Sequence, residues 1–199
     1  MIVVVDYGAG NLKSVSNALD SMLVDYTISD KPEDIENADK IILPGVGNFG
    51  HAMKTLKEKK LVEPLIKRIK EGTPYLGICL GLQLLFEKSE ESPNIKGFGI
   101  LKGEVKKLKG KFKIPHIGWN SIKKVKDSEL LEEIKEDTFF YFVHSFVGVP
   151  KDESIILTTT EYGKDFVSGI EQDNITAFQF HPEKSGKTGV AILRRFCEL

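Results

Sequence analysis

One of the two cysteines in this 199-residue chain lies in a glycine frame that is typical of a catalytic nucleophile. Residues 77–81, GICLG, have the form G-x-C-x-G, in which a strand turns sharply into a helix and exposes the central residue, Cys79. Gly77 and Gly81 have no side chains to collide in such a turn. The free N–H groups of the following helix favour the thiolate, which is the nucleophile. A buried cysteine in a glycine-rich packing site is the alternative, and the pentapeptide alone leaves both interpretations open.

A thiolate nucleophile needs a base, and one histidine has a candidate carboxylate partner. His181 and Glu183 are separated by one proline after the stretch AFQF, so in an extended segment both side chains project to the same side. A carboxylate bonded to one ring nitrogen fixes the tautomer and leaves the other nitrogen free to act on the sulfur. A turn with a solvated glutamate is the alternative for this motif. The remaining histidines are predicted to be a surface residue, His51, and two structural residues, His116 and His144.

The third motif is a glycine-rich loop, LPGVGNFG at residues 43–50, which follows another apolar stretch. Its glycines leave backbone N–H groups open to a ligand, and in acyl transfer such groups stabilise the developing oxyanion. A plain Pro-Gly turn is the alternative. All three motifs are predicted to follow strands, and sites of this kind form at the C-terminal ends of strands in open α/β sheets. Their joint occurrence predicts a Cys-His-Glu site for acyl transfer.

The elements that position these motifs alternate between strands and helices in the first half of the chain. After about residue 97 the segments are mostly strand-like, which predicts an antiparallel or mixed extension of the sheet. We therefore expect one α/β domain over residues 1–199, with an open mixed, mainly parallel sheet flanked by helices. Strands are predicted at 2–5, 40–45 and 74–79, and helices from Leu12 to Met22, at 61–71, at 80–88 and from about Ser185 to Phe196.

Composition and charge exclude several classes of protein. With 41 % hydrophobic residues, 29 % charged residues and a net charge of −1, the chain is typical of a globular protein without a field for nucleic acid or membranes. We expect a cytoplasmic protein, because no signal-peptide pattern is present and two cysteines cannot form a disulfide framework. Residues 6–14, DYGAGNLKS, lack the third glycine of a dinucleotide fingerprint and predict an ordinary strand-to-helix turn. The lysines of 102–113 are predicted to line the wet face of a hairpin.

The three motifs, in this order, resemble the class I (triad) glutamine amidotransferase family. Within it the chain is similar to the glutaminase-subunit family of imidazole glycerol phosphate synthases, from histidine biosynthesis. The resemblance covers nearly the whole chain, and its motifs are DYGAGN, LPGVGNFG, GICLGLQLLFE, PHIGWN, YFVHSF and QFHPEKS. It implies a flavodoxin-like fold with antiparallel additions in the second half, and no cofactor or metal.

The resemblance also implies roles for individual residues. Cys79 is expected to be the nucleophile, His181 the general base and acid, and Glu183 the carboxylate that orients it. The N–H groups of Gly47, in the 45–47 loop, and Leu80 are expected to form the oxyanion hole. The implied substrate-binding residues for L-glutamine are Gly45, Gly47, Gln83, Glu91, Ser145 and Phe146. Of these, Glu91 suits the α-ammonium group of the substrate.

Finally, the resemblance implies a heterodimer that channels ammonia to a cyclase subunit, a (β/α)₈ barrel that makes imidazole glycerol phosphate and AICAR. The implied interface residues are Trp119, Asn120, Tyr141 and Lys184. A peptide flip beside Gly47 is the expected switch for activation by the partner.

Three other interpretations share some of these features. The glutaminase subunit of another class I enzyme, of the anthranilate or aminodeoxychorismate synthase type, has the triad but not PHIGWN with YFVHSF. A free-standing cysteine amide hydrolase turns over without a partner. A catalytically dead binding module is disfavoured by the intact Cys79, His181 and Glu183.

Overall fold

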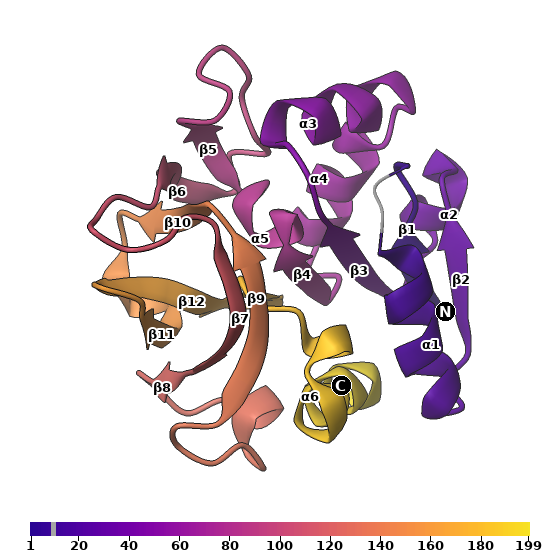
Figure 1. Cartoon of the computed structure of the whole chain (residues 1–199). Coiled ribbons are helices and arrows are strands. Elements are labelled where there is room, and N and C mark those ends of the chain that lie inside the picture. Colours follow the sequence, from indigo (N-terminus) through magenta and orange to yellow (C-terminus); the bar gives the residue numbers. More distant parts are fainter. Residues whose placement is uncertain (9–10) are drawn as a thin grey trace.

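The computed structural model describes residues 1–8 and 11–199, and its centre is an eight-stranded sheet (Figure 1). The strand order is β2-β1-β3-β4-β13-β12-β11-β8. The first five strands in this order run parallel, and the other three are added antiparallel. The strands are β1 (Ile2–Val5), β2 (Tyr26–Ser29), β3 (Lys40–Gly45), β4 (Tyr75–Cys79), β13 (Ile175–Phe178), β12 (Asp165–Gln172), β11 (Ile156–Glu161) and β8 (Lys123–Lys124).

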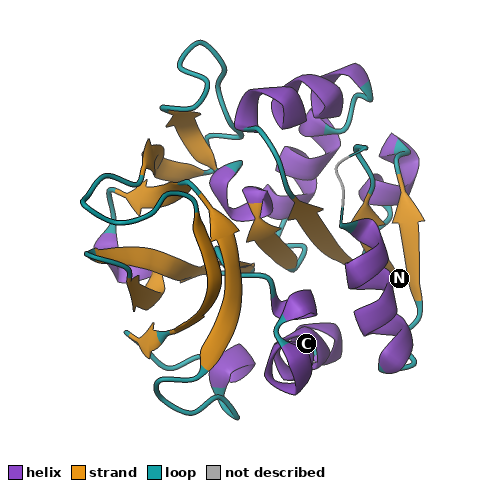
Figure 2. Cartoon of the chain, in the orientation of Figure 1, coloured by secondary structure: helices purple, strands orange, loops and turns teal. Residues whose placement is uncertain are grey.

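The central strands are apolar at almost every position because both faces of the sheet are covered. In β1, Val3 and Val5 pack into one hydrophobic cluster, whereas Ile2 and Val4 pack into the other. Helices α2 (Pro32–Glu36), α3 (Phe49–Glu58) and α4 (Val62–Lys70) cover the first face. Helices α1 (Leu12–Ser21) and α6 (Gly186–Glu198) cover the second, as Figure 2 shows.

The parallel part has the order 2-1-3-4-13, which is the flavodoxin-like arrangement. The predicted α/β class, with a mainly parallel sheet and antiparallel additions in the second half, is confirmed. Strands β3, β4 and β13 are adjacent, so their C-terminal ends bring together the glycine loop, the cysteine and the segment before His181. No helix among the described residues is long and apolar enough to cross a membrane.

Two smaller sheets complete the second half of the chain. One has the order β10-β6-β5, with β5 (Phe86–Ser89), β6 (Leu101–Lys107) and β10 (Phe146–Pro150). The other is an antiparallel ribbon of β7 (His116–Ser121) and β9 (Phe139–His144). Short 3₁₀ turns are η1 (Glu129–Leu131), η2 (Glu153–Ile155) and η3 (Pro182–Lys184). The hairpin predicted over residues 102–113 is wrong, because β6 pairs with β5 and β10.

The helix predicted over residues 80–88 is mostly wrong. Helix α5 (Leu80–Gln83) is a single turn, and β5 begins at Phe86. Long-range pairing overrides the local pattern here, since the N–H of Phe98 bonds to the Leu84 carbonyl and β5 pairs with β6. The other predicted strands and helices in the first half are confirmed within two residues. Of the turn predicted at 6–14, residues 9 and 10 lie outside the described residues.

Candidate active site

Cys79 occupies the sharp turn between β4 and α5, as the glycine frame predicts. Its backbone φ is 53° and its ψ is −99°, a combination that a residue with a side chain rarely adopts. A Cβ on Gly77 would lie 2.8 Å from the backbone of Gly81, and a Cβ on Gly81 would lie 2.0 Å from the carbonyl oxygen of Leu43. Both glycines are therefore required by close approach, and the second contact extends the turn's packing to β3.

The shortness of α5 changes the electrostatic argument for the thiolate. A helix dipole grows with the number of aligned peptide units, and α5 has one turn. The N-terminus of this element therefore gives the sulfur less stabilisation than the predicted nine-residue helix would give. Other groups have to stabilise the negative charge of Cys79.

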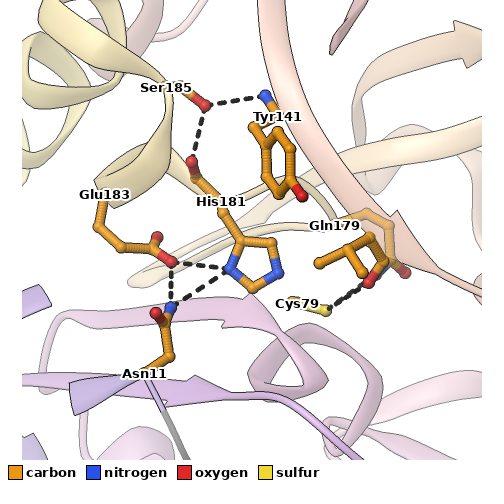
Figure 3. A network of polar contacts seen from close by, with 8 residues as sticks. Asn11, Cys79, Tyr141, Gln179, His181, Glu183 and Ser185 are labelled. Carbon is orange, nitrogen blue, oxygen red and sulfur yellow. Dashed lines mark hydrogen bonds and ion pairs between the residues drawn. The ribbon is translucent and has the colours of Figure 1, made fainter. Parts of the chain in front are cut away.

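His181 and Glu183 form a buried pair, although through a different local structure from the extended one expected. The segment from Pro182 to Lys184 is a 3₁₀ turn, and the Nδ1 of His181 lies 2.7 Å from the Oε1 of Glu183. Both side chains are fully buried. Among the described residues the Nε2 of His181 has no hydrogen-bond partner. In Figure 3 this nitrogen faces the side of the ring where Cys79 lies.

Charge around His181 favours its protonated form. Burial alone lowers the pKa of this imidazole, but the negative charges of Cys79 and Glu183 outweigh burial and raise it to about 10. The main chain of His181 is held by a bond from its N–H to the Tyr141 carbonyl, at 2.9 Å. The Ser185 hydroxyl donates to the His181 carbonyl and accepts from the Tyr141 N–H. His181 is thus fixed to strand β9 at two points.

Asn11 is a site residue that sequence reasoning missed. It precedes α1 with φ at +102°, and its side-chain NH₂ donates to Glu183 and lies 3.5 Å from the Nδ1 of His181. The sequence feature that could have indicated Asn11 is a short polar residue that follows two glycines and precedes a helix. Asparagine tolerates the left-handed backbone conformation that such a position can require. Such a residue is also common in turns without a site, so the type alone did not point to catalysis.

The glycine loop lies beside Cys79. Gly45 at the end of β3 is opposite Cys79 in the sheet register. A Cβ on Gly45 would lie 2.1 Å from the hydroxyl of Tyr7, which is buried and has no partner among the described residues. Gly47 has φ at +106°, and nothing lies within 4 Å of the position that its Cβ would take. The backbone beside Gly47 is therefore free of steric contacts on that side.

A cavity of about 250 Å³ joins these groups. Seven predicted site residues line it: Gly47, Cys79, Leu80, Gln83, Glu91, Ser145 and Phe146. Gly45 is opposite Cys79 in the sheet register, and neither it nor the His181–Glu183 pair lines the cavity, although His181 lies beside Cys79 in Figure 3. The Glu91 carboxylate also accepts the backbone N–H of Phe49, at 2.7 Å. Among the described residues, no cluster of three or more His, Cys, Asp or Glu side chains has the arrangement of a metal site.

Comparisons with known proteins agree with this geometry. The family model described as glutamine amidotransferase class-I matches residues 3–199. The chain belongs to the class I glutamine amidotransferase family.

This amidotransferase also has relatives with more specific names. It is 55 % identical over 195 residues to the imidazole glycerol phosphate synthase subunit HisH of Aquifex aeolicus, covering 98 % of this chain and 94 % of that one. It is 52 % identical to the subunits HisH of Methanocaldococcus jannaschii and Pyrococcus furiosus, over all of this chain and 100 % and 98 % of theirs.

Solved structures of low sequence identity show the fold of this amidotransferase. A crystal structure of a glutamine amidotransferase covers 100 % of the chain and 98 % of its own, at 20 % identity, with a TM-score of 0.78. The structure of PurLQS from Thermotoga maritima covers 99 % of this chain and 97 % of its own, at 21 % identity, with a TM-score of 0.74.

The predicted interface residues of this amidotransferase lie on and beside the β7–β9 ribbon. Trp119 is 56 % exposed and packs edge-on against Tyr141, which is its register partner. Asn120 donates to the carbonyl of Glu161, at 2.9 Å, and Lys184 is exposed in the turn after His181. The structural roles expected for two histidines are confirmed, since His116 and His144 are buried and bonded to each other.

Proposed function

We propose that this chain is the glutaminase subunit of an imidazole glycerol phosphate synthase, with residues 1–199 as one amidotransferase domain. It hydrolyses L-glutamine to glutamate and ammonia in histidine biosynthesis. The observation that carries the proposal is the buried His181–Glu183 pair next to Cys79, which itself lines a pocket suited to one amino acid. The sequence identity to HisH subunits over the whole chain supports the choice among class I enzymes. We expect the enzyme in the cytoplasm, where thiols stay reduced.

The first half of the reaction forms a thioester. His181 takes the proton from the Cys79 thiol, and the thiolate attacks the side-chain carboxamide carbon of glutamine. The N–H groups of Leu80 and Gly47 stabilise the oxyanion of the tetrahedral intermediate. His181 then returns the proton to the departing nitrogen, so that ammonia leaves and a γ-glutamyl thioester remains on the sulfur. Glu183 holds the imidazole in the required tautomer and stabilises its charged form.

The second half consumes water. His181 takes a proton from a water molecule, which attacks the thioester carbon in the same oxyanion hole. Collapse of this intermediate expels the Cys79 thiolate and releases glutamate. The sum of both halves is one glutamine and one water converted to one glutamate and one ammonia.

The walls of the cavity carry the substrate contacts. We assign Glu91 to the α-ammonium group, because its carboxylate lies in the pocket and the bond from Phe49 leaves acceptor capacity. Gln83, Gly47 and the backbone of residues 145 and 146 are assigned to the remaining substrate contacts in the lining, and Gly45, opposite Cys79 in the sheet register, is assigned to the base of the loop. The flip of a peptide beside Gly47 is our proposed switch, because that backbone meets no steric contact.

The partner is a cyclase subunit, proposed to be a (β/α)₈ barrel, that receives the ammonia. Its docking surface on this chain is the outer face of the β7–β9 ribbon together with Lys184. Ile117, Trp119 and Phe139 expose more than half of their side chains on this ribbon, which marks an apolar patch for a protein partner.

A glutaminase assay with and without the cyclase subunit and its nucleotide ligand tests the proposal. We expect hydrolysis of glutamine to rise strongly in the complex, since the partner stabilises the active form of the loop. Equal turnover without a partner favours a free-standing amide hydrolase instead. Stimulation only by an anthranilate-type synthase subunit favours another class I enzyme.

The variant Cys79→Ala is expected to lose glutamine hydrolysis by at least about 10³-fold while it keeps its fold and partner binding. The matched control is Cys197→Ala, because Cys197 lies on α6 away from the cavity and its loss should leave activity unchanged. Ammonia release in the complex measures both. Undiminished activity in Cys79→Ala contradicts the assignment of the nucleophile.

A further inference from the structure

Gln179 touches the nucleophile, and the mechanism above gives it no role. The residue follows β13 and comes two positions before His181. Its side chain is fully buried, and its Nε2 lies 3.5 Å from the Sγ of Cys79. Figure 3 shows Gln179 on the side of Cys79 away from Glu183. Its backbone N–H donates to the Ser168 carbonyl at 2.8 Å, which fixes the main chain below the side chain.

The neighbouring contacts decide which end of this amide faces the sulfur. The Phe146 carbonyl only accepts hydrogen bonds, so Gln83, 3.0 Å away, must present its NH₂ group to it. The same NH₂ group lies 3.2 Å from the amide of Gln179, which must therefore present its oxygen to Gln83. The NH₂ group of Gln179 is left facing Cys79. The Phe146 carbonyl thus fixes the orientation of Gln83, and Gln83 in turn fixes the orientation in which Gln179 presents its NH₂ group to the sulfur.

Two buried histidines hold the same carbonyl from the other side. The Nδ1 of His144 lies 3.1 Å from the Phe146 oxygen, so this nitrogen carries the proton and the Nε2 accepts from His116, at 3.0 Å. The Nε2 of His116 then accepts from Asn120, at 3.4 Å. Burial lowers the pKa of His144 to about 3 and that of His116 to about 4, so both rings are neutral at pH 7. Two independent donors therefore keep the carbonyl in place.

The other surroundings of the sulfur give a thiolate little help. The Val143 carbonyl lies 3.9 Å from the Sγ and is an acceptor, which suits the thiol and opposes the anion. Helix α5 is one turn long. The titratable groups near the sulfur are His181 and Tyr7, and burial together with the Cys79 charge raises the pKa of Tyr7, which stays protonated. His181 supplies the positive charge, and the NH₂ group of Gln179 is positioned as a neutral donor.

We propose that Gln179 is a catalytic residue that donates a hydrogen bond from its side-chain NH₂ group to the Cys79 thiolate, in an orientation set by Gln83. The inference rests on the proposed role of Cys79 as the nucleophile. Gln179 exchanges no proton, because the thiol proton goes to His181. The bond stabilises the anion before attack, weakens when the sulfur becomes part of the neutral thioester, and strengthens again when water expels the thiolate.

The test compares Gln179→Met with its parent, because methionine has a similar length and no donor. All proteins carry Cys197→Ser, so that iodoacetamide reacts only at Cys79. We expect the pH midpoint of alkylation to rise by about one unit, equivalent to about 1.4 kcal/mol. In the complex at pH 7, kcat/KM for glutamine should fall about tenfold. Far-UV circular dichroism and thermal unfolding report whether the variant is folded.

Two further variants keep the test decisive. Thr158→Val removes a buried hydrogen bond to Ser168, 2.9 Å long, in the adjacent strands without touching the sulfur, and should leave the alkylation profile unchanged. Gln179→Glu preserves shape and the acceptor for Gln83 but turns an oxygen toward the sulfur, so its midpoint should rise at least as far as in Gln179→Met. A parental pH profile in both Gln179 variants overturns the proposal. A parent that is inactive with its partner instead overturns the proposed function, while alkylation still measures the hydrogen bond.

Discussion

His181 depends on its carboxylate partner for orientation and for charge. In Glu183→Gln the amide oxygen can still accept from the Nδ1 of His181, but the negative charge that stabilises the imidazolium is lost. We expect kcat to fall about a hundredfold, which is less than in His181→Ala. Steady-state glutaminase assays of both variants in the complex measure the difference. Equal losses would contradict this prediction, because they would mean that the imidazole contributes nothing once the charge of Glu183 is lost, even with the hydrogen bond kept.

The buried histidine pair makes the fold sensitive to acid. Both rings have a folded-state pKa below the ordinary value of 6.5, at about 4 for His116 and about 3 for His144. The unfolded chain therefore binds more protons between these values and 6.5, and stability is lost as the pH falls through this window. In His116→Phe, which preserves stacking on Phe142 and Tyr162, we expect the acid limb to be shallower by up to about 1.4 kcal/mol per pH unit.

Urea unfolding of the wild type and His116→Phe between pH 4 and pH 7 measures this effect. The variant is expected to be less stable at pH 7, because it leaves the Nε2 of His144 without its donor. Carboxylates add their own acid limb to both proteins, so the difference between the two curves is the relevant quantity. Parallel curves would show that His116 takes up its proton equally well in the folded chain.

At the scale of elements, the turn from β4 into α5 depends on a glycine that touches a neighbouring strand. A Cβ on Gly81 would lie 2.0 Å from the Leu43 carbonyl, and the backbone of Leu43 is held in the sheet by its pairing with β4. We expect Gly81→Ala to lower the free energy of unfolding by about 3 kcal/mol and to slow alkylation of Cys79. The matched control is Gly110→Ala, where the new atom meets only the movable ring of Phe112. Its cost should stay below about 0.5 kcal/mol.

Chemical denaturation of both glycine variants decides this prediction. Equal stabilities would mean that β3 and α5 can separate without cost. That result would also remove the reason given for a glycine two residues after Cys79.

The sequence predicted the elements whose patterns are local. The strands with uninterrupted β-branched residues and the helices α1, α4 and α6 could be predicted from the sequence. A strand buried on both faces is apolar at every position, and a helix buried on one side has apolar residues at helical spacing. Residues 84–88 could not be, because three apolar residues followed by Glu87 and Lys88 fit the end of a helix and the start of a strand alike. Their pairing with β6 is set by residues far along the chain. The candidate site residues Cys79, His181 and Glu183, which lie together in the structure, were predictable from type and spacing, whereas Asn11 and Gln179 belong to types that occur in many turns and strands.

At the scale of the whole molecule, a substitution of the exposed Trp119 is expected to weaken partner binding without changing the stability of the fold. Trp119 is 56 % exposed, so Trp119→Ala removes little buried area and should leave the free energy of unfolding within about 0.5 kcal/mol. Tryptophans at interface centres are frequent hot spots, and we expect the affinity for the cyclase subunit to fall about tenfold to a hundredfold. The control is Leu23→Ala, since Leu23 is 93 % exposed after the end of α1, at the opposite edge of the sheet.

Titration of the labelled partner with each variant measures the two affinities. If both variants bind as the wild type does, the β7–β9 ribbon is not the docking surface. If both are weakened alike, the effect belongs to general surface hydrophobicity.

Two chains of hydrogen bonds meet at the Phe146 carbonyl oxygen, and this arrangement has a consequence for proton transfer. Every donor points toward this oxygen, from Asn120 through two histidines on one arm and from Gln83 on the other. A relay of protons needs members that accept on one side and release on the other. A peptide carbonyl has no proton to release, and amide side chains keep theirs at neutral pH. The hydrogen-bonded connection between the outer ribbon and the sulfur therefore fixes positions but cannot carry a proton from the ribbon surface to Cys79.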